Sequence, residues 1–128
     1  PVLIIKLDFP AKELMPNKSN GRHWSATSGL KETQRDSAYL LTKRVIGDWK
    51  PTEANIPLSI MFLTPDKRNR DVDNLLSSLK SGLDGVAQAL GVNDKQFRPL
   101  LIDWTQGEKP GAVIVAIGVQ IKSGVNLE

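Results

Sequence analysis

The chain has 128 residues, no cysteine and a formal net charge of +3. This length predicts one domain over residues 1–128 with a small core, and the missing cysteines exclude disulfides and thiolate metal sites. The longest apolar run, AVIVAIGVQI, is about half of what a membrane span needs, and no secretory signal is recognisable. We therefore expect a cytoplasmic protein without a membrane partner.

The first half of the chain predicts a strand, a long loop and a helix. The strand is expected over 2–9, which is rich in β-branched residues. Residues 11–29 hold prolines, glycines and serines without a sustained period, which indicates a loop. A helix is expected over 30–49, with Pro51 closing it and an apolar stripe at spacings of three and four: Ala38, Leu41, Val45, Ile46 and Trp49.

The second half predicts a central strand, a helix and a hairpin. Residues 55–65 are apolar on both faces toward their end, which favours a central strand. Residues 73–90 carry a clean helical stripe before Gly91. Strands 98–104 and 111–121 are expected to pair across the turn TQGEKP. The order β-α-β-α-β-β predicts an α/β (α+β) fold, with two main helices on a small mixed sheet.

The stretch RNRDVDNLLSSLK, residues 68–80, is the strongest candidate for chemistry. If residues 70–73 are extended, the two-residue period turns Asp71 and Asp73 to one side. Such a pair suits Mg²⁺ or Mn²⁺, which prefer oxygen ligands and keep open positions for water and phosphate. On the helix, Asp73, Lys80 and Asp84 form one polar row beside the apolar stripe.

A purely structural interpretation of these residues is also available. Aspartate is a good N-cap and favours a helix N-terminus, so one of Asp71 and Asp73 is explained as a cap. The other is then a partner for Arg68 or Arg70. Asp94 would simply make an Asx-turn, in which its side chain bonds to nearby backbone.

RDVDNLLSSLKSGLDGVAQALGVND resembles the signature of the RusA-type Holliday junction resolvases, which are crossover-junction endodeoxyribonucleases of bacteria and their phages. The shared pattern is D-x-D-N-L, a lysine-bearing helix running into D-[AG]-[LV], a closing glycine and a further acid. The likeness covers about 25 residues strongly and extends to an N-terminal loop of the PN...GRHW kind. The family lysine stands four residues after the second aspartate, where this chain has Ser77; Lys80 follows by seven.

The resemblance implies a homodimeric, Mg²⁺-dependent enzyme that cuts four-way DNA during recombination or repair. The resemblance implies that each protomer supplies its own site of three aspartates and a lysine. Carried over by position, the metal ligands are Asp71, Asp73 and Asp94, with Lys80 as the catalytic lysine. A bacterial cell is the implied setting, with a phage or prophage gene as one source.

Basic and aromatic residues complete the expected DNA-binding surface. Lys67, Arg68 and Arg70 are expected to hold flanking phosphates. The long loop offers Arg22, His23 and Trp24 to unstacked bases at a junction centre. Two alternatives stay open: a nuclease acting on flaps or other branched DNA, and a non-catalytic protein that binds branched DNA.

Overall fold

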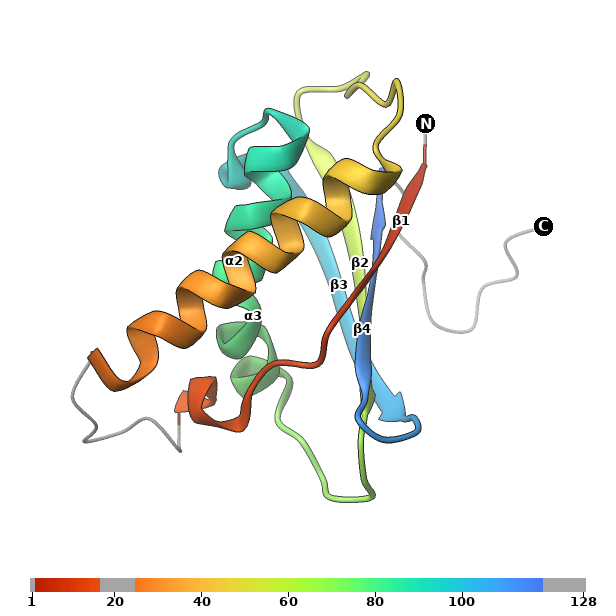
Figure 1. Ribbon diagram of the computed structural model, residues 1–128. Coiled ribbons are helices and arrows are strands. Elements are labelled where there is room, and N and C mark those ends of the chain that lie inside the picture. Colours follow the sequence, from red (N-terminus) through yellow and green to blue (C-terminus); the bar gives the residue numbers. More distant parts are fainter. Residues whose placement is uncertain (1, 17–24, 119–128) are drawn as a thin grey trace.

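The computed structural model of the chain describes residues 2–16 and 25–118. Its described part folds into a four-stranded sheet with two long helices, so the predicted fold class is confirmed (Figure 1). In chain order, the elements are β1 (Leu3–Leu7), the 3-10 helix η1 (Lys12–Leu14), α2 (Ser25–Val45), β2 (Ile56–Thr64), α3 (Val72–Leu90), the 3-10 helix η2 (Asp94–Gln96), β3 (Phe97–Gln106) and β4 (Ala112–Ile117).

The sheet has the strand order β1-β4-β2-β3, so the predicted hairpin between residues 98–104 and 111–121 is wrong. β3 runs parallel to β2 after the α3 crossover, whereas β4 lies antiparallel to both β1 and β2. The burial of the strands explains this order. β4 is buried along most of its length and takes a central place, while β3 is largely exposed and forms an edge.

The connection from β3 to β4 passes the end of β2, and two glycines allow this close approach. Gly107 donates its N–H to the Thr64 carbonyl at 2.8 Å, and a Cβ at Gly107 would lie 2.9 Å from the Leu63 Cβ. Gly111 has a φ of +85°, and a Cβ there would lie 2.8 Å from the Leu63 carbonyl oxygen. TQGEKP is therefore a turn, but one that spans a strand instead of joining neighbours.

α2 begins at Ser25 and ends at Val45, so both predicted ends, 30 and 49, are wrong. Its first turn is polar in sequence, yet Thr27 is buried, which shows that tertiary packing decides this start. Gly47, with a φ of +53°, follows the end of the helix and turns the chain well before Pro51. Val45 is 48% exposed, whereas Thr42 is fully buried and bonds to the Ala38 carbonyl.

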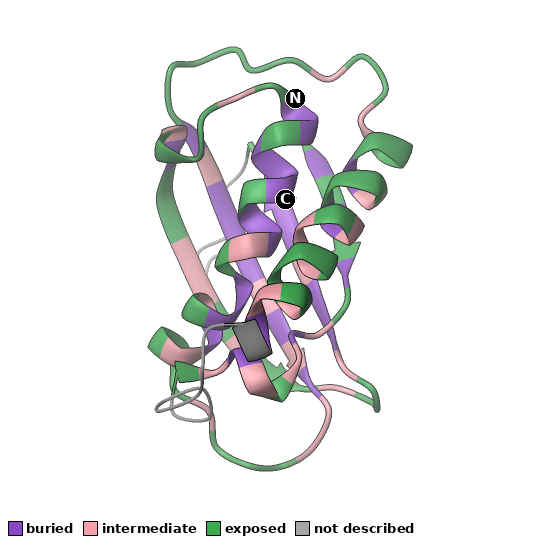
Figure 2. Cartoon of the chain, turned by 60° about the vertical axis from the view of Figure 1, so that its left-hand side comes forward, coloured by how far each residue is buried: buried purple, intermediate pink, exposed green. Residues whose placement is uncertain are grey.

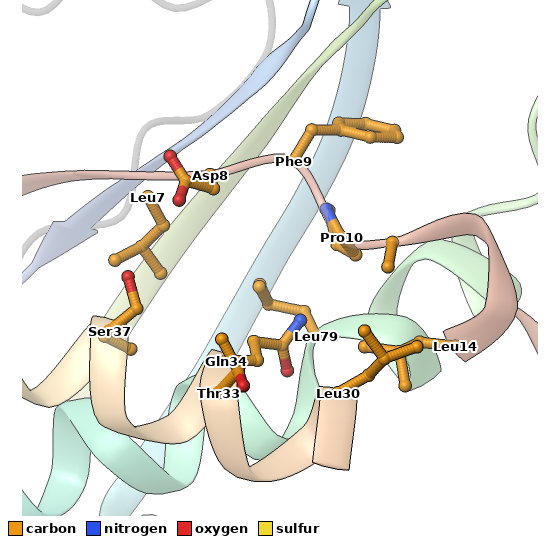
Figure 3. A pocket seen from close by; sticks show the side chains of 12 residues that line it. Leu7, Asp8, Phe9, Pro10, Leu14, Leu30, Thr33, Gln34, Ser37 and Leu79 are labelled. Carbon is orange, nitrogen blue, oxygen red and sulfur yellow. The ribbon is translucent and has the colours of Figure 1, made fainter. Parts of the chain in front are cut away.

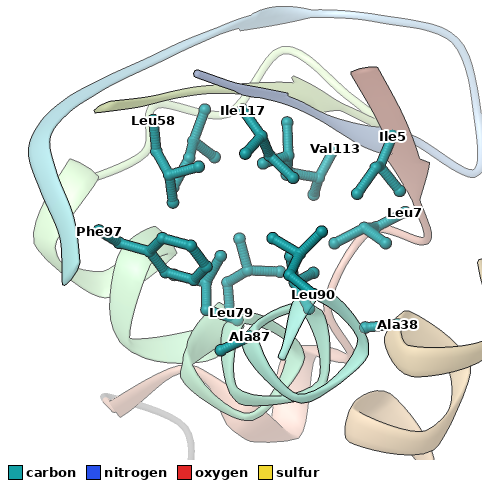
Figure 4. Close-up of a cluster of buried hydrophobic side chains, with 14 of the residues drawn as sticks. Ile5, Leu7, Ala38, Leu58, Leu79, Ala87, Leu90, Phe97, Val113 and Ile117 are labelled. Atoms are coloured by element: carbon teal, nitrogen blue, oxygen red, sulfur yellow. The ribbon is translucent and has the colours of Figure 1, made fainter. Parts of the chain in front are cut away.

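α3 matches the predicted helix 73–90 to within one residue. Asp71 caps its start, and Gly91, at a φ of +72°, ends it in the left-handed conformation. Both helices cover one face of the sheet, with α3 directly beneath the strands and α2 beside it (Figures 2 and 4). The fully buried apolar side chains come from α3 and from the strands β1, β2 and β4: Ile5, Leu58, Ile60, Phe62, Leu75, Leu79, Val86, Val113, Val115 and Ile117.

Candidate functional site

The loop between β2 and α3 is organised by one carboxylate, Asp66, which binds two arginines. The Arg68 Nε lies 3.2 Å from each Asp66 oxygen, and its Nη2 lies 3.0 Å from Oδ2. Arg70 donates from Nη1 to Oδ1 at 2.8 Å. These bonds, with that from Arg70 first, hold the pKa of the Asp66 carboxyl well below its usual range. The arginines therefore pair with Asp66, not with Asp71 or Asp73.

The two motif aspartates stand at the start of α3 and differ in what they contact. Asp71 has extended backbone, and its Oδ1 accepts the Asp73 N–H at 2.9 Å. It is therefore a helix cap. Asp73 belongs to the first helical turn and is exposed, and within the described residues its carboxylate has no hydrogen bond or ion pair. Because the helix begins at Val72, residues 70–73 are not an extended run.

A cleft of about 550 Å³ opens beside this helix start. One wall comes from the chain around η1, and the other comes from the β2–α3 loop and the first turn of α3. The residues that line it are Phe9, Pro10, Lys12, Met15, Pro65, Arg68, Asn69, Arg70, Asp71, Asn74 and Leu75. Lys67 is exposed on the same loop. The lining thus includes three cationic residues and one carboxylate. Asp66 pairs with both arginines, so the cleft is only weakly basic, with three cations against the two carboxylates Asp71 and Asp66.

Asp94 lies at the opposite end of α3 from Asp71 and Asp73. α3 has 19 residues, which corresponds to about 28 Å at the usual rise. Asp94 opens η2 beyond that helix, directly after Asn93, whose side chain caps η2. A site built from all three aspartates therefore does not form within one chain. The described residues hold no group of three His, Cys, Asp or Glu side chains that could bind a metal.

Asp94 instead lies beside Asp84, which belongs to the C-terminal half of α3. Partial desolvation raises the pKa of the Asp84 carboxyl, and the neighbouring Asp94 raises it further. Arg35 and Lys80 oppose this rise. Lys80 is exposed and follows Asp73 by about 10 Å along the helix axis. The structure thus groups Lys80 with Asp84 and Asp94, away from the cleft.

The remaining predicted DNA contacts, Arg22, His23 and Trp24, lie outside the described residues. The sequence interpretation missed three residues around the cleft. Asp66 had a local signal, because it precedes Arg68 and Arg70 by two and four residues within PDKRNR. Asn69 lies within the candidate stretch RNRDVDNLLSSLK but was not singled out. Lys12 had no local signal, since only the fold brings η1 opposite the β2–α3 loop.

A second cavity, of about 140 Å³, lies between the end of β1, α2 and α3 (Figure 3). Its lining is mainly apolar, with Leu7, Leu30 and Leu79 among its walls. Gln34 also lines it, and its amide bonds to α3: Nε2 donates to the Ser78 carbonyl and Oε1 accepts from the Gly82 N–H. We interpret this cavity as a packing gap between the elements.

The fold and the cleft define a small α+β domain with a basic recess at the start of one helix. No family model matches the chain. The chain is 32% identical over 119 residues to an uncharacterized protein of Xylella fastidiosa (strain Temecula1), an alignment that covers 88% of this chain and 74% of the relative. It belongs to the same family as that bacterial protein. None of the helices in the described part is long and apolar enough to cross a membrane.

Proposed function

We propose that the chain is a Mg²⁺-dependent endodeoxyribonuclease of the RusA type that resolves Holliday junctions. The observation that carries the proposal is the position of the D-x-D-N motif. Asp71 and Asn74 line a cleft whose other charged residues are Lys12, Arg68 and Arg70. A carboxylate next to an exposed guanidinium group suits a phosphodiester substrate, since Arg68 binds phosphate oxygens while Asp71, with Asp73 two residues further on, holds a hard cation.

The donor set at the start of α3 fits Mg²⁺, with Mn²⁺ as a substitute. Asp73 is exposed, and Asp71 uses its Oδ1 for the cap, which leaves its second oxygen for a metal. Two carboxylates suffice, because Mg²⁺ keeps several waters and takes the rest of its ligands from substrate. When bound, the metal polarises the scissile phosphate and lowers the pKa of a coordinated water.

We propose that Asp94 and Lys80 take part in the same reaction from the second subunit of a homodimer. A two-fold axis presents two equivalent sites, which suits the two symmetric cuts in a four-way junction. In such a dimer, Asp94 and Lys80 of one protomer complete the site at Asp71 and Asp73 of the other. Lys80 then neutralises charge that develops on the leaving oxygen. The relative comes from a bacterium. The cytoplasmic setting and the phage or prophage gene remain part of the proposal.

A second candidate is a protein that binds branched DNA without cutting it. The observation in its favour is that Asp71 caps α3 while Asp94 lies at the other end of that helix. In this alternative, Arg68 and Lys67 still bind phosphate, and the acids serve only the fold. A nuclease that prefers flaps is the remaining alternative, because nothing in the cleft encodes the shape of a branch.

The test is cleavage of a synthetic four-way junction with Mg²⁺ or Mn²⁺, comparing wild type with Asp73→Asn. The wild type is expected to make paired symmetric nicks, and the variant is expected to lose at least about 100-fold in rate while it still binds the junction. Asp48→Asn is the matched control, because Asp48 is an exposed aspartate in the turn that follows α2.

Three results would contradict the proposal or part of it. Binding without cleavage by the wild type favours the non-catalytic protein. Faster cleavage of a flap than of a junction favours the other nuclease. Full activity of Asp73→Asn removes Asp73 from the site.

A further inference from the structure

The two walls of the cleft carry cations that face the same space from different parts of the chain. Lys12 lies on η1, whereas Arg68 lies on the β2–α3 loop. We propose that this cleft clamps the phosphodiester backbone of one DNA strand between Lys12 and Arg68, and that Asp66 is the positioning residue that orients Arg68. The inference rests on the proposed function only in taking DNA as the ligand.

Arg68 keeps free donors although Asp66 binds it. The carboxylate takes the Nε edge of the guanidinium, at 3.2 Å from Nε and 3.0 Å from Nη2. A guanidinium has five N–H donors, so the Nη1 group and one Nη2 hydrogen remain for a phosphate. The Arg68 side chain is 75% exposed, which leaves this outer edge accessible.

Arg70 has a different role from Arg68. Its side chain is only 12% exposed, and Nη1 donates both to Asp66 Oδ1 and to the Arg68 carbonyl at 2.6 Å. Asp66 Oδ1 also accepts the Arg68 backbone N–H at 2.9 Å. Arg70 therefore braces the loop from within, and Asp66 fixes both the backbone and the side chain of Arg68. A donor that is held in place before binding loses less conformational entropy when it meets its ligand.

The size and lining of the cleft favour one strand as the occupant. About 550 Å³ is within the range of pockets that hold single small ligands, roughly 300–1,000 Å³. This volume accommodates a phosphate with its neighbouring sugars. Phe9, Pro10 and Met15 supply apolar surface on the η1 wall for the sugars.

The test is binding of a fluorescent single-stranded oligodeoxynucleotide, measured by anisotropy in EDTA over a range of salt. Arg68→Ala is expected to weaken binding roughly tenfold. The logarithm of the binding constant falls linearly with the logarithm of the salt concentration, and we call the steepness of this line the salt slope. Lys12→Ala is expected to reduce the salt slope by about 0.7, which is the contribution of one phosphate contact on a single strand. Lys50→Ala is the control and is expected to change neither quantity, because Lys50 is an exposed lysine in the connection between α2 and β2.

Asp66→Asn gives the decisive readout. Removing a negative charge near a polyanion strengthens binding if Asp66 acts only as a charge, whereas a positioning role predicts severalfold weaker binding. The double variant Asp66→Asn/Arg68→Ala should then bind no more weakly than Arg68→Ala alone. Thermal melting of each variant checks that it remains folded.

The clamp is overturned if Asp66→Asn binds as tightly as wild type or more tightly, if Lys12→Ala leaves the salt slope unchanged, or if the wild type does not bind the strand. Because the assay contains no divalent cation, its result is separate from that of cleavage. If the wild type binds the strand as expected but never cuts DNA, the clamp is supported and the nuclease activity is contradicted. If Asp66→Asn cuts DNA at the wild-type rate and also binds the strand as tightly as wild type, the nuclease activity is supported and the clamp is contradicted.

Discussion

Asp71 carries two proposed roles, and two substitutions separate them. Asparagine also accepts the N–H bond that caps α3, whereas alanine cannot. We expect Asp71→Asn to keep the free energy of unfolding near that of wild type and Asp71→Ala to lower it by about 1 kcal/mol. Both should abolish junction cleavage if the carboxylate also binds metal. Urea denaturation and the cleavage assay measure the two effects.

Either role of Asp71 can be contradicted separately. Cleavage that survives in Asp71→Asn would make this residue a cap and nothing more. Unchanged stability in Asp71→Ala would show that another group replaces the cap. A loss of stability in both variants would mean that the charge itself, and not only the hydrogen bond, supports the helix start.

At the residue scale, local spacing predicted the candidates but not their contacts. Asp71 was recognisable both as a cap and as a ligand, because aspartate at a helix start suits both. The structural alternative paired Arg68 or Arg70 with a motif aspartate, yet both bind Asp66. Lys12 had no local signal, because its place opposite Arg68 depends on segments that are distant in sequence.

At the level of elements, Gly85 is expected to control how closely α2 and α3 pack. A Cβ at this position would collide with the Arg35 carbonyl oxygen and would lie 3.2 Å from the Ala38 Cβ. We expect Gly85→Ala to lower the free energy of unfolding by about 1–3 kcal/mol, because backbone must move to relieve the overlap. Urea denaturation measures this loss.

Gly29→Ala is the matched control for Gly85→Ala. Gly29 also lies within a helix, but a Cβ there would meet nothing within 4 Å. Alanine should therefore raise the stability by up to about 1 kcal/mol through its better helix propensity. Equal effects of the two substitutions would show that helix packing at Gly85 is not limiting.

The helices and strands were predictable to different extents, for identifiable reasons. α3 has a full apolar stripe, an aspartate cap and a closing glycine, so its local signals agree. α2 starts in the polar residues after Ser25, where its contacts with η1, β1 and α3 override weak propensity. The strands near 98–104 and 111–121 were found, although residues 119–121 lie outside the described residues. Their pairing was not found, since a short turn usually joins neighbouring strands.

At the scale of the whole molecule, α3 separates Asp73 from Asp94, and this separation makes the dimer testable. Asp73→Asn and Asp94→Asn are each expected to be inactive. In a mixture, a heterodimer keeps one complete site, formed by Asp71 and Asp73 of one protomer with Asp94 of the other. We expect unfolding and refolding of the mixed variants to restore nicking of one junction strand, as seen on a denaturing gel.

Other outcomes of the mixing experiment identify different arrangements. No recovery in the mixture, although each variant is folded and dimeric, argues against a shared site. Full activity of Asp94→Asn alone leaves the two carboxylates at the start of α3 as the whole ligand set. Sedimentation that shows only monomers removes the proposed homodimer.

The sequence by itself determined the fold class, the helix α3 with both of its ends, and the cluster of acids and arginines around its start. These features depend on apolar periodicity, capping and turn residues, which act between neighbours in the chain. Only the tertiary structure decided the strand order, the start of α2, the pairing of Asp66 with two arginines, and the meeting of Lys12 with the β2–α3 loop. It also showed that Asp94 lies far from Asp71 and Asp73, because the 19-residue helix α3 runs from one end to the other. The spacing of residues in a motif does not give such a distance in space.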